Sequence, residues 1–255
     1  MQINALLILL ISHIIGDFYL QNNKLAQLKD RQYSGVVIHS VLYCIPFILM
    51  SFFTDGFINY FKISLLACLS HFIIDSYKYY VIKSYKIYAN RNYNNIVLKT
   101  VLDYIKDINR QRLIYIVDQG IHILIIILLC HVFKDIYLSF YLSSSRIFRW
   151  TLIMLCIYRP ANITFYKLFA EFKPVCDITS NSTNKKAGSI IGLLERVLIV
   201  VFLYLGQYSS IGLTLTAKSI ARYNMISENK EFAEYYLIGT LYSVIISLIL
   251  FLLIL

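Results

Sequence analysis

Charged residues are scarce in this chain. Only 15% of its 255 residues are Asp, Glu, Lys or Arg, whereas 58% are hydrophobic. An ordinary soluble domain has about a quarter charged residues, so the composition excludes a typical soluble globular protein. Apolar stretches long enough to cross a bilayer recur along the chain. We therefore predict an integral membrane protein with several spans.

Two further features are missing. The first apolar run, at residues 3–20, has no basic segment before it and no small-x-small cleavage site, and it contains His13 and Asp17. We therefore expect it to be retained as a span and not removed as a signal peptide. The five cysteines have no paired spacing, which is typical of small buried apolar residues and not of a disulfide or thiolate framework.

The apolar runs predict helices, because backbone polar groups in lipid must be satisfied within their own segment. The expected fold is an all-α, polytopic transmembrane helical bundle with interfacial helices. About seven spans are predicted, at residues 3–20, 35–53, 61–82, 112–133, 147–158, 189–208 and 234–255. We divide them into a four-helix transmembrane domain at 1–135 and a C-terminal transmembrane region of about three spans at 136–255. Residues 209–227 are too polar to span easily, so an interfacial or re-entrant helix is expected there.

Most basic residues lie in two loops, at 21–34 and 83–112, which explains much of the formal net charge of +10. Both loops follow odd-numbered spans, so the positive-inside bias places them in the cytoplasm and the N-terminus outside. This pattern favours membrane lipids as partners and argues against nucleic acid. Residues 96–108 have apolar side chains at helical spacing, which predicts an amphipathic helix on the membrane surface. A second copy of the chain and a cytoplasmic partner at loop 83–112 are further expected partners.

Ionisable residues inside the first four predicted spans are the main functional signal. Three of these spans hold a His and an Asp four residues apart, and the second span holds a lone His. The seven residues are His13, Asp17, His39, His71, Asp75, Asp118 and His122. Residues four apart share one face of a helix, and an intramembrane Asp costs at least about 2.5–3.5 kcal/mol on insertion scales.

The nitrogen and oxygen donors of this set suit a divalent metal ion, with zinc as the expected cofactor. We predict that the four helices bring the seven groups together as an intramembrane metal site. Seven groups exceed what one tetrahedral ion takes, so some of them orient ligands or two ions share the site. The sequence assigns no separate catalytic residue. The fifth histidine, His131, is predicted to be interfacial.

Three classes of function remain open at this point. The first is a metal-dependent hydrolase that acts on a lipid or another membrane-borne substrate. The second is an ion- or proton-coupled transporter, which the absence of a clear inverted repeat disfavours. The third is a non-enzymatic scaffold, since buried His–Asp pairs also hold helices together without a metal. No H-E-x-x-H signature supports hydrolysis directly.

The C-terminal half has polar residues of its own. Lys218 and Arg222 are four residues apart and are predicted either to bind a lipid phosphate or to extend toward the headgroups. Glu195 and Arg196 are adjacent. Neighbouring residues point about 100° apart on a helix, so we expect these two to contact different partners.

Four segments carry a resemblance to a known family: SHIIGDFYLQ, the isolated IHS, SHFIIDSYK and IVDQGIH. In this order the chain resembles the DUF3307 family of bacterial membrane proteins of unknown function, over roughly residues 5–130. The resemblance implies the bacterial inner membrane and a site shared by the family. It implies no particular reaction.

Overall fold

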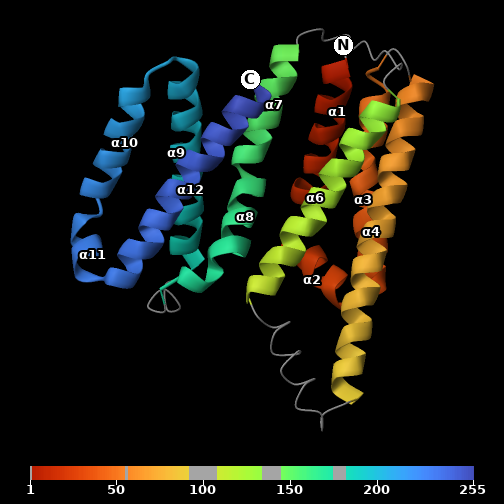
Figure 1. Cartoon of the computed structure of the whole chain (residues 1–255), viewed down its shortest axis with the longest axis horizontal. Helices are drawn as coiled ribbons and strands as arrows, with labels where there is room; N and C mark the ends of the chain where they lie inside the picture. The colour runs from red at the N-terminus through yellow and green to blue at the C-terminus, as the bar shows by residue number, and fades with distance from the viewer. Residues whose placement is uncertain (1, 55–56, 92–107, 134–144, 175–181) are drawn as a thin grey trace. The chain divides into compact units, whose positions relative to one another are not determined.

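The computed structural model describes residues 2–54, 57–91, 108–133, 145–174 and 182–255. Every regular element in this part of the chain is a helix (Figure 1), so the all-α prediction is confirmed. The chain divides into two compact units, Met1–Phe148 and Arg149–Leu255. The boundary lies 13 residues after the predicted division at residue 135.

The first unit is a bundle built around four long helical segments. Its elements are α1 (Gln2–Ile14), the π-helical turn η1 (Ile15–Tyr19), α2 (Asn23–Arg31), α3 (Tyr33–Ser51), α4 (Phe57–Arg91) and α6 (Ile108–Val132). Helix α3 packs against α1 and α4, and α6 packs against the same two helices. The apolar core of the unit comprises Ile8, Leu9, Tyr43, Phe47, Tyr60, Ile63, Ala67, Cys68 and Ile126.

Helix α4 has the reverse of the polarity found in a soluble bundle. Its outward stripe is apolar, with Ile58 67% exposed and Ile73 64% exposed. Its inward stripe contains Ser64, His71 and Asp75, all buried. Apolar side chains outside and polar side chains inside fit a lipid environment, where intramembrane ionisable residues face the interior of the bundle.

Four helices of the described part are long and apolar enough to cross a membrane. They are Tyr33–Ser51, Phe57–Ser84, Gln111–Val132 and Lys230–Ile254. A fifth span results if Ala5–Tyr19 and Asn23–Arg31, which meet at a bend of 84°, are counted as one broken span. The structure thus supports a membrane-type helical bundle, and the predicted count of seven exceeds what these helices show.

Both predicted basic loops contain helix. Loop 21–34 includes α2, whose first turn is capped by Asn22, since its Oδ1 accepts from the Leu25 backbone nitrogen at 2.8 Å. The predicted span at 61–82 corresponds to the candidate span Phe57–Ser84, and helix α4 continues beyond this span to Arg91. The predicted surface helix at 96–108 lies almost entirely outside the described residues.

Helix α2 crosses very close to the start of α3, and Gly35 permits this approach. A Cβ added to Gly35 would lie 2.7 Å from the Leu28 carbonyl oxygen, and it would also meet the backbone nitrogen of Lys29. Backbone atoms cannot rotate away as a side chain does, so any larger residue at this position must displace α2.

We therefore expect Gly35→Ala to lower the free energy of unfolding by about 1–3 kcal/mol, the usual cost of overpacking. Gly120→Ala on α6 is the matched control, because a Cβ there meets nothing within 4 Å. The control should be neutral or slightly stabilising, since Ala favours a helix over Gly. Thermal unfolding of both variants in the same detergent measures the difference. Equal midpoints would contradict the close approach of α2 to α3.

The second unit begins within α7 (Ser145–Ile157). It also contains α8 (Arg159–Phe169), the short 3₁₀ turn η2 (Ala170–Phe172), α9 (Ser182–Tyr204), α10 (Tyr208–Ile220), α11 (Tyr223–Glu228) and α12 (Lys230–Ile254). Helix α12 packs against α9 and α8, and α10 packs against α9. Residues 209–227 fall in α10 and α11 (Figure 1). Gly206 has a φ of 68°, a left-handed conformation that glycine adopts without strain, and it forms the turn that returns the chain along α9.

Candidate metal centre

The structure brings all seven predicted His and Asp residues together inside the first unit. They come from α1 and η1, α3, α4 and α6. Every one is at most 9% exposed, although ionisable side chains are rarely buried without a partner. The sequence prediction that these side chains face a common interior is thus matched by their positions.

The π-helical turn η1 positions Asp17. His13 lies at the end of α1, and the next five residues form the wider turn, closed by a bond from the Leu20 nitrogen to the Ile15 oxygen at 3.0 Å. Such turns occur frequently at functional sites. A Cβ on Gly16 would lie 2.8 Å from Cδ2 of Tyr43, so glycine lets η1 approach α3 and brings the Asp17 carboxylate to His39.

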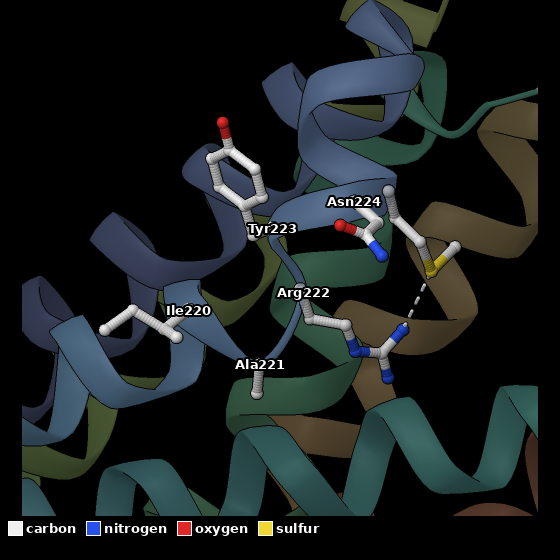
Figure 2. A pocket seen from close by; sticks show the side chains of 6 residues that line it. Ile220, Ala221, Arg222, Tyr223 and Asn224 are labelled. Carbon is white, nitrogen blue, oxygen red and sulfur yellow. Dashed lines mark hydrogen bonds between the residues drawn. The ribbon is translucent and has the colours of Figure 1, made fainter.

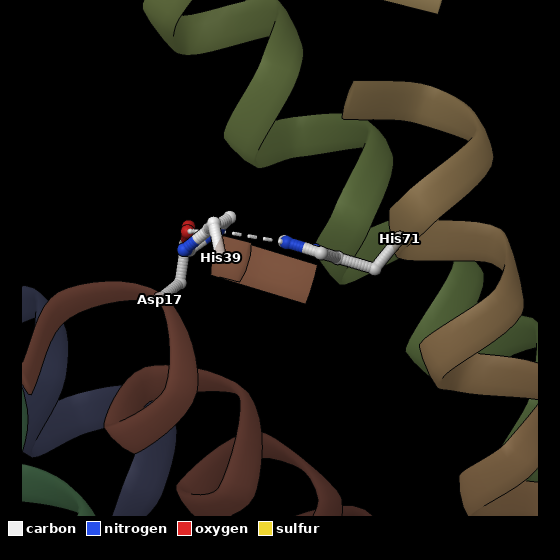
Figure 3. Close-up of side chains that lie close together, drawn as sticks. All are labelled: Asp17, His39 and His71. Carbon is white, nitrogen blue, oxygen red and sulfur yellow. Dashed lines mark hydrogen bonds and ion pairs between the residues drawn. The ribbon is translucent and has the colours of Figure 1, made fainter. Parts of the chain in front are cut away.

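Four atoms that could bind a metal ion, two imidazole nitrogens and two carboxylate oxygens, lie close together at the centre of the cluster. The Nε2 atom of His39 lies 3.1 Å from Asp17 Oδ1, 3.2 Å from His71 Nε2 and 3.5 Å from Asp75 Oδ2. His71 Nε2 lies 3.3 Å from the same oxygen of Asp75. Figure 3 shows Asp17, His39 and His71 pointing toward one another from three different helical segments.

These separations are close to those of ligands around zinc. With bonds of about 2.0–2.1 Å, two ligand atoms of a tetrahedral zinc ion lie about 3.3–3.4 Å apart. Hydrogen bonds give similar separations, so the number of polar neighbours around one atom is the more informative feature. One Nε2 atom of a neutral imidazole carries at most one proton, whereas His39 Nε2 has three polar atoms within 3.5 Å.

Two overlapping groups have the geometry to hold an ion. One consists of Asp17, His39 and His71, and the other of His71, Asp75 and His122; within each, the ligand atoms lie within 4.8 Å of one another. His71 belongs to both. Asp118 and His13 lie beside these groups: Asp118 Oδ1 is 3.8 Å from His122 Nε2, and the His13 ring is 5.8 Å from the His122 ring.

Several buried polar atoms of the cluster lack a hydrogen-bond partner among the described residues. They include the Nε2 atoms of His13 and His122, the Nδ1 atoms of His39 and His71, and the Oδ1 atoms of Asp75 and Asp118. A buried polar atom without a partner costs about 1–3 kcal/mol, and an ion is one of the accepted explanations for such a group. The residues present therefore fit a divalent metal.

Three polar partners of the cluster were not predicted from the sequence. The Lys29 ammonium lies 2.5 Å from Asp75 Oδ2, and the Lys78 ammonium lies 2.8 Å from Asp118 Oδ2. The Gln119 amide donates to Asp17 Oδ2 at 2.7 Å. The position of Lys78 beside the site could have been predicted from the sequence, because it lies seven residues after His71 and three after Asp75, on the same face of α4. No comparable spacing in the sequence indicates that Lys29 or Gln119 contacts the site.

Tyr43 orients two of the histidines. Its ring stacks on the His71 ring with centroids 3.7 Å apart and planes 4° from parallel. Its hydroxyl lies 3.0 Å from His13 Nδ1. Groups that orient metal ligands typically contribute about 10–100-fold to metal affinity.

Removing the stacked ring with Tyr43→Leu should therefore weaken metal binding about tenfold or more. Tyr60→Leu is the matched control, because Tyr60 is equally buried in the same apolar core but its hydroxyl lies near Ser12 and not near a histidine. Competitive titration with a metal-binding dye measures the affinities, and thermal unfolding should show similar losses of stability. Equal affinities for the two variants would exclude a positioning role for Tyr43.

In the second unit, Lys218 and Arg222 do not form a shared surface. Lys218 donates to both carboxylate oxygens of Glu195 at 2.9 and 2.8 Å and to Thr240 Oγ1 at 2.9 Å. Helix α10 ends at Ile220, so Arg222 lies beyond it. Figure 2 shows Arg222 in a pocket formed by residues 220–225, where its guanidinium contacts the Met225 sulfur. The role of these two residues in binding a lipid phosphate stays a prediction, and for Lys218 the structure supplies a different anionic partner.

Glu195 and Arg196 contact different partners, as predicted. The Arg196 Nε donates to the Ile157 carbonyl oxygen at 2.7 Å, at the end of α7, and a second guanidinium nitrogen donates to Asn162 Oδ1 at 2.6 Å. Arg196 thus satisfies a carbonyl at the break between α7 and α8. The guanidinium lies over Gly192, 3.3 Å from where a Cβ would be.

A helical bundle with apolar outer faces and a buried His/Asp cluster defines the first unit as a membrane-type protein with a candidate metal centre. The chain belongs to the DUF3307 family, described as proteins of unknown function, whose family model matches residues 5–149. The match covers nearly all of the first unit and includes the seven clustered residues. No curated protein and no solved structure matches the chain.

Proposed function

We propose that this protein is a metal-dependent hydrolase of the inner membrane that acts on a lipid or another membrane-borne substrate. The observation that carries the proposal is the convergence of Asp17, His39, His71 and Asp75 at separations typical of zinc ligands. Zinc is the ion that this donor set suits best. His122 completes the second ligand group.

Zinc held with an open position supplies a water molecule acidic enough to act as a nucleophile near neutral pH. The cluster also offers a carboxylate for proton transfer. Asp118 lies outside both ligand groups, and its Oδ1 has no hydrogen-bond partner among the described residues. Lys78 holds the other oxygen and thereby fixes the carboxylate. We assign Asp118 as the general base or acid.

The proposed orientation places the cluster near the cytoplasmic headgroups. Tyr33, Tyr79 and Tyr80 have ring centroids 5.3–5.6 Å apart, and tyrosines are enriched at membrane interfaces. Tyr80 is five positions after Asp75, which corresponds to about 7.5 Å along a helix. The apolar core of the unit, including Phe47 and Ile63, lies on the other side of the cluster. This one-sided position favours a hydrolase with access to one leaflet over a transporter, whose site usually lies near the bilayer midplane.

The finer topology belongs to the same proposal. The first span is α1 with η1, and α2 then runs along the cytoplasmic surface. In the second unit, α9 is 23 residues long, enough to cross a bilayer of about 30 Å. Helices α7 and α8 follow each other with one residue between them and together would form one further span. With α12, this arrangement accounts for the seven predicted spans and leaves the N-terminus outside. Helices α10 and α11 then return the chain along α9 as an eighth crossing, because Leu255 at the end of α12 accepts from Arg149 near the start of α7 at 3.2 Å.

A non-enzymatic scaffold is the second candidate, because Lys29 and Lys78 already pair with two of the three carboxylates. The variant Asp118→Asn distinguishes the hydrolase from the scaffold. For a hydrolase, this variant should keep its metal and lose about 10²–10⁴-fold in turnover, the usual contribution of a general acid or base. Asp30→Asn, on the exposed face of α2, is the control.

The measurement combines the metal content of the purified protein with mass spectrometry of a total lipid extract incubated with it. Metal in stoichiometric amount, together with lipid products that Asp118→Asn fails to form, is the expected result. Protein without metal in any preparation would overturn the proposal and leave the scaffold.

A further inference from the structure

The two lysines at the cluster lie on its outer edge. In the Lys29–Asp75 pair, the lysine side chain is 13% exposed and the carboxylate is fully buried. In the Lys78–Asp118 pair, the corresponding values are 29% and 8%. Both ammonium groups therefore lie between the metal-ligand candidates and the surface of the unit, on the side of Tyr79 and Tyr80.

The charges of the cluster do not cancel once a metal is present. Asp17, Asp75 and Asp118 contribute three negative charges, and Lys29 and Lys78 contribute two positive ones. With neutral imidazoles, a divalent ion changes the sum from −1 to +1. An unbalanced charge in a buried site is costly, so the metal-loaded site favours an anionic ligand.

We propose that the site takes a phosphate group, bound by the metal together with the ammonium groups of Lys29 and Lys78. This inference rests on the metal centre proposed above and names the chemical class of its ligand. A phosphate offers several strong acceptor oxygens, and a lysine ammonium offers three donors. When Asp75 serves as a ligand to the metal, its partner Lys29 becomes available to the phosphate.

The position of α2 fits this assignment. Leu25 on α2 is buried, whereas Lys24 and Asp30 are exposed, so the helix is amphipathic and suited to the membrane surface. Lys29 extends from this helix to Asp75 on α4. In the orientation proposed above, these ammonium groups lie near the cytoplasmic headgroups and within reach of a lipid phosphate, and the same chemistry would also bind free phosphate.

The test uses the full-length protein in detergent, with native mass spectrometry to count bound metal and bound lipid in the same molecule. The probes are dioleoyl phosphatidic acid, dioleoyl phosphatidylcholine and inorganic phosphate. The variants are Lys29→Gln and Lys78→Gln, with Lys29→Arg as the charge-conserving variant. Lys24→Gln on α2 and Lys62→Gln on α4 are matched controls, since both lysines are exposed on the same helices.

We expect phosphatidic acid to bind metal-loaded protein. Each glutamine variant should bind it about tenfold or more weakly, which is the loss expected for one charge-assisted hydrogen bond. Lys29→Arg and both controls should bind as the wild type does. Metal content should be unchanged in folded variants, which separates a lost ligand contact from a lost fold.

Two results would overturn the inference, and a third decides between a lipid phosphate and free phosphate. Equal binding of phosphatidic acid by the glutamine variants and the controls would remove the lysines from the site, while metal in all of them would leave the hydrolase proposal intact. Tight binding of inorganic phosphate that displaces phosphatidic acid would assign the site to free phosphate and not to a lipid. Wild-type protein that binds neither metal nor phosphate would refute both the proposed function and this inference.

Discussion

Replacing His71 with alanine is expected to abolish stoichiometric metal binding. His71 is the one residue shared by the two ligand groups, and its Nε2 lies 3.2 Å from His39 Nε2 and 3.3 Å from Asp75 Oδ2. Structural zinc sites contribute roughly 10–16 kcal/mol. If one of four ligands accounts for about a quarter of that, its loss weakens binding about a hundredfold or more.

His131→Ala is the matched control for this prediction. His131 lies near the end of α6, the same helix as His122, but is exposed and outside both ligand groups. Elemental mass spectrometry of both variants, purified in parallel, gives the metal-to-protein ratio. The wild type and His131→Ala should carry metal, and His71→Ala should not. Metal retained by His71→Ala at the wild-type ratio would place the ion elsewhere.

The His and Asp residues could be identified from the sequence as candidates for a site, because an ionisable side chain inside an apolar segment costs free energy. An ionisable side chain inside an apolar run needs a partner, so Asp17, Asp75 and Asp118 indicate a site by their places in the sequence alone. The four-residue spacing to a histidine then identifies the helix face. Only the helical repeat and the length of the spans are needed for this prediction, and both are local properties of the sequence.

The lysine partners could not be predicted in the same way. Lys29 lies in a basic segment that the positive-inside bias explains without any site. Its contact with Asp75 depends on how closely α2 crosses α3 at Gly35, which is a tertiary property. The π-helical turn that orients Asp17 likewise has no signature in the segment IGDFY. Hydropathy alone also does not reveal the break between α7 and α8, so the predicted fifth span at 147–158 ends where α7 ends and does not include α8.

Glu195→Gln is expected to lower the free energy of unfolding by about 2–3 kcal/mol, independently of any metal. Glu195 is 5% exposed, and both of its carboxylate oxygens accept from Lys218. Removing one partner of a buried ion pair usually costs about 3–5 kcal/mol because the other charge stays unpaired. The Lys218 side chain is 21% exposed, so water offsets part of this cost.

The exposed pair Lys230–Glu234 on α12 provides the control for this prediction. Its side chains are 91% and 60% exposed and 4.0 Å apart, so Glu234→Gln should change stability by less than about 1 kcal/mol. Thermal unfolding in detergent compares the two variants. A double variant, Glu195→Gln with Lys218→Met, should recover much of the loss, because no charge is then left unpaired between α9, α10 and α12. If Glu195→Gln unfolds at the same temperature as Glu234→Gln, the pair does not hold these three helices together.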